Sequence, residues 1–202
     1  MLIQMKALNI PGWKNSRAGH WQTIWEADDP QTFSRIEQDE WLNPQKADWV
    51  KRIGETLSHA GSDVIVTAHS IGVTAFLHAV HEYNLKVKGA LLVAPSDPEH
   101  PDCIPEIKNF SPIPRQKIPF PAIVVASSDD PGMDYRKISR LAVAWRCTLN
   151  ILESAGHIEP KSGFGKWPEG RRLLKRFFES LETCHKNTRC SCRCPCFPEQ
   201  IH

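Results

Sequence analysis

The sequence has no long hydrophobic run. No stretch approaches the roughly 18 consecutive apolar residues that a membrane-spanning helix needs. The segment Met1–Lys6 also lacks the long apolar core of a secretory signal peptide. We therefore expect a cytoplasmic protein with no membrane partner.

An excess of charge of one sign is missing as well. Lys and Arg total 25 while Asp and Glu total 23, so the formal net charge is +2. A net charge this small does not predict binding to a polyanion, so we expect no nucleic-acid partner. The hydrophobic content of 41% fits an ordinary globular domain of one core.

Cysteine is scarce in most of the chain and concentrated at its end. Five of the seven cysteines lie from Cys184 onward, and Cys190 to Cys196 is an alternating Cys-x-Cys run. Zinc sites usually combine two separated pairs of ligands, so this run does not predict a metal site. We expect one domain over residues 1–183, a disordered tail over residues 184–202, no metal and no cofactor.

Apolar strands and amphipathic helices alternate along the chain. Short apolar runs predict strands at 6–10, 32–36, 64–66, 89–94, 122–127 and 148–152. Helical spacing of apolar residues predicts helices at 20–26, 47–60, 71–83, 135–145 and 170–183. The segment 95–121 holds eight prolines and is expected to be mostly loop. The pattern implies an α/β fold with a mostly parallel sheet, helices on both faces, and ligands beyond the carboxyl ends of the strands.

A sharp turn between a strand and a helix carries the most informative motif, Ala68-His69-Ser70-Ile71-Gly72. This arrangement predicts a nucleophile elbow, in which a strained turn lifts the Ser70 hydroxyl beside a helix N-terminus. The backbone N–H of Ile71 would then point at an oxyanion formed next to Ser70. Ala68 departs from the usual pattern, which has a glycine at this position.

A serine nucleophile needs a base and an acid that orients the base. In folds of this kind the chain order is serine, acid, histidine. His157 follows the last predicted strand, whereas six of the other histidines precede the acid and two lie in or beside the tail. Asp97, Asp129 and Asp130 all follow strand ends, and the rigid Pro131 favours Asp130 without excluding the other two.

The loop after the first strand is where this kind of fold supplies a second oxyanion donor. Pro11-Gly12-Trp13 occupies that loop, and the backbone N–H of Trp13 is our candidate. Gly12 would allow the backbone to approach closely. We expect His20 and Trp21, in the Trp-rich segment that follows, to line the substrate pocket, with Trp13, Trp21 and Trp25 as apolar walls.

Together these motifs resemble a family of small serine hydrolases within the α/β-hydrolase superfamily. The family includes bacterial YdeN-like proteins and vertebrate retinoblastoma-binding protein 9. The resemblance covers about residues 5–182 and rests on Pro11-Gly12-Trp13, His20-Trp21-Gln22, Ala68-His69-Ser70-Ile71-Gly72, Ala126-Ser127-Ser128-Asp129-Asp130-Pro131 and Gly156-His157-Ile158. His-Ser-x-Gly without a preceding glycine is usual in this group.

The resemblance implies a compact α/β-hydrolase fold without a large lid. It also implies a triad of Ser70, Asp130 and His157 that acts on small esters. Our prediction is a carboxylic ester hydrolase that works through an acyl-enzyme on a small-molecule ester. The alternative is a protein-interaction module on a hydrolase fold, with weak or vestigial activity and a protein partner.

Overall fold

The computed structural model describes residues 5–186, with side chains described through Thr183. The chain divides into two compact units, Met1–Lys166 and Trp167–His202. The first unit holds the sheet and most of the helices, and the second holds the last helix. The run from Cys190 to Cys196, and with it most of the predicted tail, lies outside the described residues.

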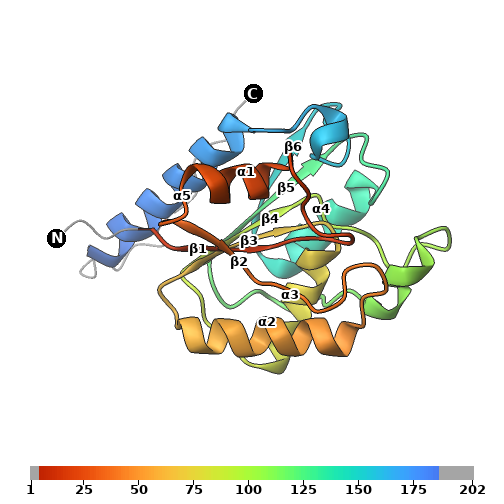
Figure 1. The fold of residues 1–202 in the computed structure, drawn as a ribbon, viewed down its shortest axis with the longest axis horizontal. Helices are drawn as coiled ribbons and strands as arrows, with labels where there is room; N and C mark the ends of the chain where they lie inside the picture. The colour runs from red at the N-terminus through yellow and green to blue at the C-terminus, as the bar shows by residue number, and fades with distance from the viewer. Residues whose placement is uncertain (1–4, 187–202) are drawn as a thin grey trace. The chain divides into compact units, whose positions relative to one another are not determined.

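Six strands form the sheet of the first unit (Figure 1), and every neighbouring pair is parallel. The order across the sheet is β2-β1-β3-β4-β5-β6. Because the chain builds outward in opposite directions from β1, the crevice between the loops that follow β1 and β3 is the expected ligand site. The strands are β1 (Ala7–Ile10), β2 (Phe33–Arg35), β3 (Ile65–His69), β4 (Gly89–Val93), β5 (Ala122–Ser127) and β6 (Thr148–Leu152).

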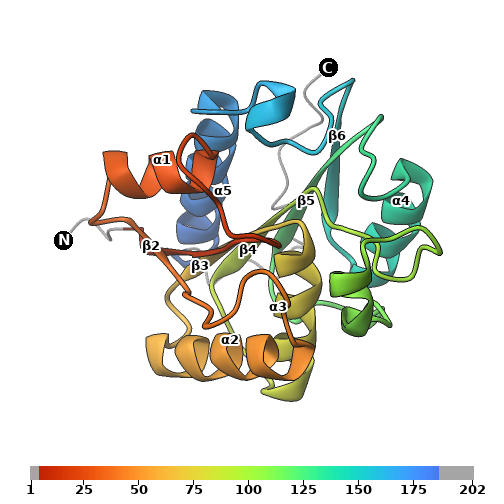
Figure 2. The ribbon, with the colours of Figure 1, turned by 45° about the vertical axis from the view of Figure 1, so that its right-hand side comes forward.

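Helices lie on both faces of this sheet. Figures 1 and 2 show α1 on one face and α2 and α3 on the other. Strand residues such as Val66, Leu92 and Val124 join one buried cluster with side chains of α2, α3 and α4. The helices of the first unit are α1 (Trp21–Asp28), α2 (Lys46–Ala60), α3 (Ile71–Glu82) and α4 (Tyr135–Trp145).

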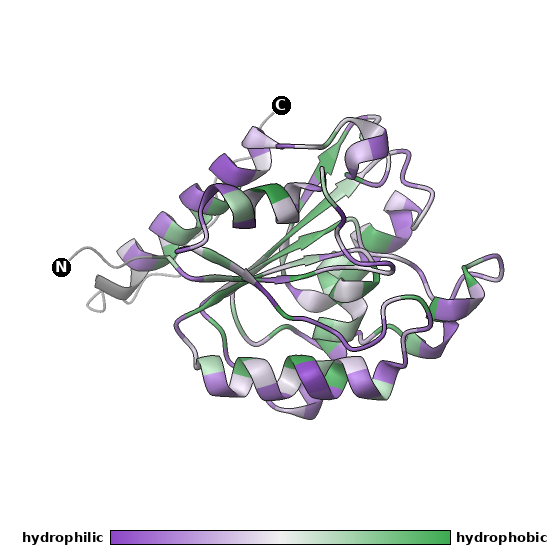
Figure 3. Cartoon of the chain, in the orientation of Figure 1, coloured by the Kyte–Doolittle hydropathy of each residue, from purple (hydrophilic) through white to green (hydrophobic). Residues whose placement is uncertain are grey.

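The second helix shows why the predicted pattern holds. In α2 the buried residues Trp49, Val50, Ile53 and Leu57 recur at the spacing of one helical face. Figure 3 shows the same alternation of hydrophobic and hydrophilic residues along α2, while the strands are mainly hydrophobic. Gly61 ends the helix with a φ of +78°, a conformation that favours glycine.

The proline-rich segment 95–121 is mostly loop, as predicted, and contains one short 3₁₀ helix at Pro105–Phe110. A second 3₁₀ helix, Pro160–Ser162, follows β6. Both begin with proline. The first N–H groups of a helix have no acceptor within that helix, so proline, which lacks an N–H, costs no hydrogen bond at this position. The fold therefore confirms the predicted order of elements and a parallel α/β sheet.

The second unit contains α5 (Pro168–Lys186), which starts two residues before the predicted helix 170–183 and ends three residues after it. Leu174, Phe177 and Leu181 recur along it at the spacing of one helical face. Across residues 5–186, no helix is long and apolar enough to cross a membrane.

Candidate active site

The backbone at Ser70 makes the sharp turn that the sequence predicts. Ser70 stands between β3 and α3 with φ +58° and ψ −131°, a conformation that is strained for a residue with a Cβ. Its N–H donates to the carbonyl of Val93 in the neighbouring strand, at 3.0 Å. The turn therefore presents the Ser70 side chain at the carboxyl edge of the sheet.

Close backbone packing holds this turn in place. A Cβ at Gly72 would lie 2.4 Å from the carbonyl oxygen of Pro11, and a Cβ at Gly12 would lie 2.6 Å from the Cβ of Ser70. Both positions therefore require glycine, because a real Cβ does not approach so closely. Ala68, in contrast, lies within β3 opposite Ile10 and is fully buried in the core, so its methyl group is accommodated.

Three side chains from three loops meet at this edge. Ser70 Oγ lies 2.9 Å from His157 Nε2, and His157 Nδ1 lies 2.8 Å and 3.0 Å from the two carboxylate oxygens of Asp130. The Asp130 side chain is only 3% exposed, whereas His157 is 19% exposed. The structure thus brings together the serine, aspartate and histidine that the sequence singles out.

Asp130 is held by its own turn. The N–H of Gly132 donates to Asp130 Oδ1 at 2.7 Å. A Cβ at Gly132 would lie 2.9 Å from His157 Cε1, so a larger residue would push against the imidazole. Gly132 was not among the predicted site residues, although Pro131-Gly132 is a recognisable turn dipeptide.

The two rival aspartates engage other groups. Asp129 accepts hydrogen bonds from the Ser127 hydroxyl at 2.6 Å and from the Gly156 N–H at 2.8 Å. These bonds lower the pKa of Asp129. Ser127 Oγ in turn accepts from the Ala155 N–H at 2.8 Å, so the pair Ser127 and Asp129 fastens the loop that carries His157.

Asp97 lines the same cavity and forms an ion pair there. Its Oδ1 lies 2.5 Å from Lys137 Nζ, and the same ammonium lies 2.8 Å from Glu99. Asp97 is nearly fully buried, so this contact satisfies a carboxylate that would otherwise be costly to bury. Its backbone N–H donates to the Gly132 carbonyl at 2.9 Å, which ties the loop after β4 to the loop after β5.

The two predicted oxyanion donors have no acceptor for their backbone N–H groups within the part of the chain that the structure describes. They are the N–H groups of Ile71, at the first position of α3, and of Trp13, in the loop after β1. An amide in the first turn of a helix has no acceptor within that helix, so it is free for a ligand. Both residues line the cavity that contains Ser70.

A second histidine joins the Ser70 turn to the His157 loop. His69 Nε2 lies 3.0 Å from the carbonyl oxygen of His157, so this nitrogen carries a proton and donates. The His69 ring is 5.0 Å from the His157 ring and 4.8 Å from the His20 ring. Burial, then the neighbouring His20 and His157, hold the pKa of His69 well below its usual value.

His20 lines the cavity, as expected, whereas Trp21 does not. His20 Nδ1 accepts from the Gln22 N–H at 3.2 Å and caps α1. Burial, then Arg35 and His157, lower the pKa of His20 to about 3. Trp21 is fully buried behind His20, where its indole N–H donates to the Ile158 carbonyl at 3.1 Å.

The prediction that three tryptophans wall the cavity is therefore wrong for two of them. Trp13 lines it, but Trp21 and Trp25 do not. Trp25 is buried and its indole donates to the Lys166 carbonyl at 2.9 Å. The α1 spacing that joins Trp21 and Trp25 turns both toward the core, where the chain needs large apolar side chains.

The cavity at Ser70 has a volume of about 950 Å³. Apolar side chains from the loop after β4 and from the loop after β5 form one wall, namely Cys103, Ile104, Ile107, Pro131 and Met133. Ser70, His157 and Ser96 are among the polar residues that line the cavity. Such a cavity suits a small ligand with an apolar part and one reacting polar group.

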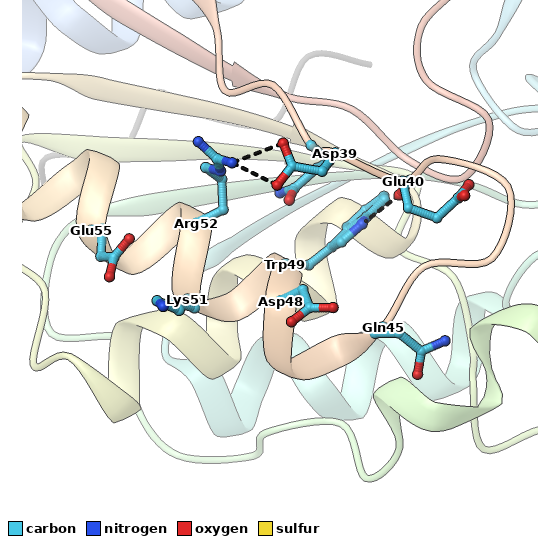
Figure 4. Close-up of a pocket in the computed structure, with 9 residues that line it drawn as sticks. Asp39, Glu40, Gln45, Asp48, Trp49, Lys51, Arg52 and Glu55 are labelled. Carbon is cyan, nitrogen blue, oxygen red and sulfur yellow. Dashed lines mark hydrogen bonds and ion pairs between the residues drawn. The ribbon is translucent and has the colours of Figure 1, made fainter.

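Another, smaller cavity of about 290 Å³ lies beside α2 and shares no residue with the first (Figure 4). In it, Arg52 binds both carboxylate oxygens of Asp39, and the Trp49 indole donates to the Glu40 carbonyl. These groups satisfy one another, and the lining contains no serine, cysteine or histidine. The Ser70 cavity is therefore the candidate active site.

The comparisons with known proteins point to a family of hydrolases. The family model described as serine hydrolase matches residues 7–176. No protein of curated function matches the sequence. A YdeN-like hydrolase from Pectobacterium atrosepticum has 32% identity and a TM-score of 0.78, with 88% of this chain and 92% of that chain covered.

Two more distant structures share the fold. The ydeN gene product of Bacillus subtilis has 19% identity and a TM-score of 0.72, over 87% of this chain and 100% of that chain. A thermophilic esterase from Thermogutta terrifontis has 10% identity and a TM-score of 0.65, over 88% and 90%. With the family model and the YdeN-like relative in agreement, the α/β-hydrolase fold is established and the chain belongs to the serine hydrolase family.

Proposed function

We propose that this serine hydrolase cleaves small carboxylic esters through an acyl-enzyme, with Ser70 as nucleophile, His157 as base and Asp130 as the acid that orients the base. The observation that carries the proposal is the unbroken chain of contacts from Asp130 through His157 to Ser70. The Asp130 carboxylate fixes the proton on Nδ1, which leaves Nε2 free to accept the Ser70 proton.

In acylation, Ser70 Oγ attacks the ester carbonyl while its proton moves to His157 Nε2. The C–Oγ bond forms as the carbonyl π pair moves to oxygen and gives an oxyanion. Collapse of this tetrahedral species breaks the bond to the alcohol oxygen, which takes the proton from His157. Buried Asp130 stabilises the imidazolium that exists between these steps.

In deacylation, His157 takes a proton from water as the water attacks the acyl carbon. The bond to Ser70 Oγ then breaks, and the proton returns from His157 to Ser70. The products are a carboxylic acid and the regenerated serine. In each half-reaction His157 accepts one proton and gives it back, so the proton count balances without another acid or base.

The backbone N–H groups of Ile71 and Trp13 are proposed to bind the oxyanion. Gly12 allows the loop that bears Trp13 to lie directly against Ser70. Donors fixed by backbone packing need no reorganisation as charge develops, and removal of one such donor typically costs about 10²–10³ in kcat.

Ester substrates are supported by the fold neighbours and by the cavity. The Thermogutta terrifontis structure is described as an esterase, and a Bacillus subtilis neighbour as a carboxylesterase. The apolar wall with Ile104, Ile107 and Met133 suits an acyl or alcohol chain. His20 lines the same cavity and is proposed as a substrate-pocket residue.

The test is hydrolysis of short p-nitrophenyl esters by the wild-type protein and by Ser70→Ala. We expect the variant to lose about 10⁴–10⁶ in kcat, because it lacks the nucleophile but keeps the fold. Labelling by a fluorophosphonate is the parallel readout and should occur at Ser70 alone. Equal ester hydrolysis by both proteins would refute the mechanism, and a folded wild-type protein that resists labelling would favour the interaction module.

A further inference from the structure

The Ser70 hydroxyl has a second hydroxyl as a neighbour. Ser96 Oγ lies 2.8 Å from Ser70 Oγ, and the same Ser70 Oγ lies 2.9 Å from His157 Nε2. Ser96 is in the loop after β4, is only 6% exposed, and lines the same cavity. Sequence reasoning did not single it out, although it follows a strand end as the other site residues do.

The protons at the site decide which hydroxyl donates. The Asp130 carboxylate only accepts, so His157 carries its proton on Nδ1 and its Nε2 accepts. Ser70 must therefore donate its single hydroxyl proton to His157. Because that proton is committed, the contact between the two serines requires Ser96 to donate and Ser70 to accept.

We propose that Ser96 is a further catalytic residue, which donates a hydrogen bond to Ser70 Oγ during acyl transfer. This proposal rests on the proposed ester hydrolysis at Ser70. Two hydrogen bonds fix the Ser70 hydroxyl, one donated to His157 and one accepted from Ser96. One lone pair of Ser70 Oγ remains, and it is the pair that attacks the ester carbon.

The Ser96 bond contributes most when Ser70 Oγ carries negative charge. This charge grows as the proton moves to His157 before the C–Oγ bond is complete, and again when Ser70 leaves the acyl carbon in deacylation. Hydrogen bonds to charged oxygen are stronger than those to neutral oxygen. Ser96 keeps its own proton throughout, so the proton balance of the reaction is unchanged.

The sheet and its loops hold Ser96 in position before substrate binds. The Ser70 N–H bonds to Val93 at the end of β4, three residues before Ser96. The chain turns at Ala94, which has a φ of +43°. On the other side, Asp97 is fixed by Lys137 and by the Gly132 carbonyl. Anchors on both sides of Ser96 give it the preorganisation that a catalytic donor needs.

The test compares wild-type protein, Ser96→Ala and Ser70→Ala in ester hydrolysis and in fluorophosphonate labelling. The probe phosphonylates Ser70 with loss of fluoride and does not require deacylation, so its rate reports the attack by Ser70 separately from deacylation. We expect Ser96→Ala to lower kcat and the labelling rate constant together, by about tenfold to a hundredfold, with little change in KM. Ser96→Thr and Ser96→Val match in shape and differ in the hydroxyl. We expect Ser96→Val, which lacks the hydroxyl, to have the lower kcat and the lower labelling rate constant of the two.

A matched control is Ser139→Ala, which removes a hydroxyl that donates to the Tyr135 carbonyl on α4, outside the cavity. It should leave the labelling rate unchanged. Wild-type labelling and kcat in folded Ser96→Ala would overturn the role of Ser96. If Ser96→Ala does not fold, equal rates for the Thr and Val variants would overturn it. Failure of the proposed function differs from both outcomes, since wild-type protein would then behave like Ser70→Ala.

Discussion

The turn at Ser70 and the loop after β6 place two parts of one site by different means. Steric exclusion holds the turn: a Cβ at Gly72 would meet backbone atoms of Ile10 and Pro11, and a Cβ at Gly12 would meet the Ser70 side chain. Hydrogen bonds hold the loop: Ala155, Gly156 and the His157 carbonyl are bound by Ser127, Asp129 and His69. Substitutions that add atoms at the glycines should therefore disrupt the turn. Substitutions that remove hydrogen-bond donors or acceptors should disrupt the loop.

Substitutions of the two aspartates after β5 are expected to change kcat/KM by the largest factor. Asp130→Asn should lower kcat/KM by about 10³–10⁴-fold, because an amide favours the wrong tautomer of His157. Asp129→Asn keeps an oxygen that can accept from Gly156, so we expect a loss of less than about tenfold. Ester kinetics of both variants are the measurement. A larger loss in Asp129→Asn would show that the loop, and not the Asp130 contact, limits the reaction.

The glycine after the turn gives the next effect. An alanine within a helix ordinarily stabilises a protein by up to about 1 kcal/mol relative to glycine. Gly72→Ala should instead destabilise this protein by about 1–3 kcal/mol, because its methyl group would meet the Pro11 carbonyl. Denaturant unfolding measures the change.

Gly165→Ala is the control for that substitution. A Cβ there would lie 3.6 Å from the Gly19 carbonyl, which is ordinary contact. We expect its unfolding free energy to stay close to that of the wild-type protein. A Gly72→Ala variant that is as stable as Gly165→Ala would refute steric control of the turn.

His20, the buried histidine that caps α1, gives the smallest effect near neutral pH, because its contribution to stability changes only as the pH falls. The pKa of His20 is lowered from 6.5 to about 3, so the unfolded chain binds a proton there between these values that the folded protein does not. Stability should therefore fall as the pH drops below about 6.5. This one group contributes up to about 1.4 kcal/mol per pH unit at the steepest.

His20→Asn isolates that contribution, because asparagine can still cap α1 by accepting from Gln22. We expect a shallower loss of thermal stability between pH 6.5 and pH 4 in this variant. His59→Asn, at an exposed position of α2, is the control and should keep the wild-type slope. An unchanged slope in His20→Asn would mean that His20 takes up its proton in the folded state as well.

The order of strands and helices, and the order serine, aspartate, histidine at strand ends, could be predicted from the sequence alone. Apolar spacing is a local property, and parallel strands bring their carboxyl ends to one edge whatever the loops do. For this reason the sequence alone predicts Ser70, His157 and the candidate acids. The family resemblance selects Asp130 among the candidate acids. It also explains Ala68, because members of this family usually lack the glycine at that position.

Only the tertiary structure shows which loop side chains meet. Asp129 and Asp130 are neighbours in the chain, yet one faces Gly156 and the other His157. Trp21 turns into the core, and Ser96 reaches Ser70 across 26 positions of sequence. These contacts depend on loop conformations and on packing between segments distant in sequence, and no periodic pattern records either. The sequence alone determined that a reactive serine would stand at the edge of the sheet, and the fold decided which groups surround it.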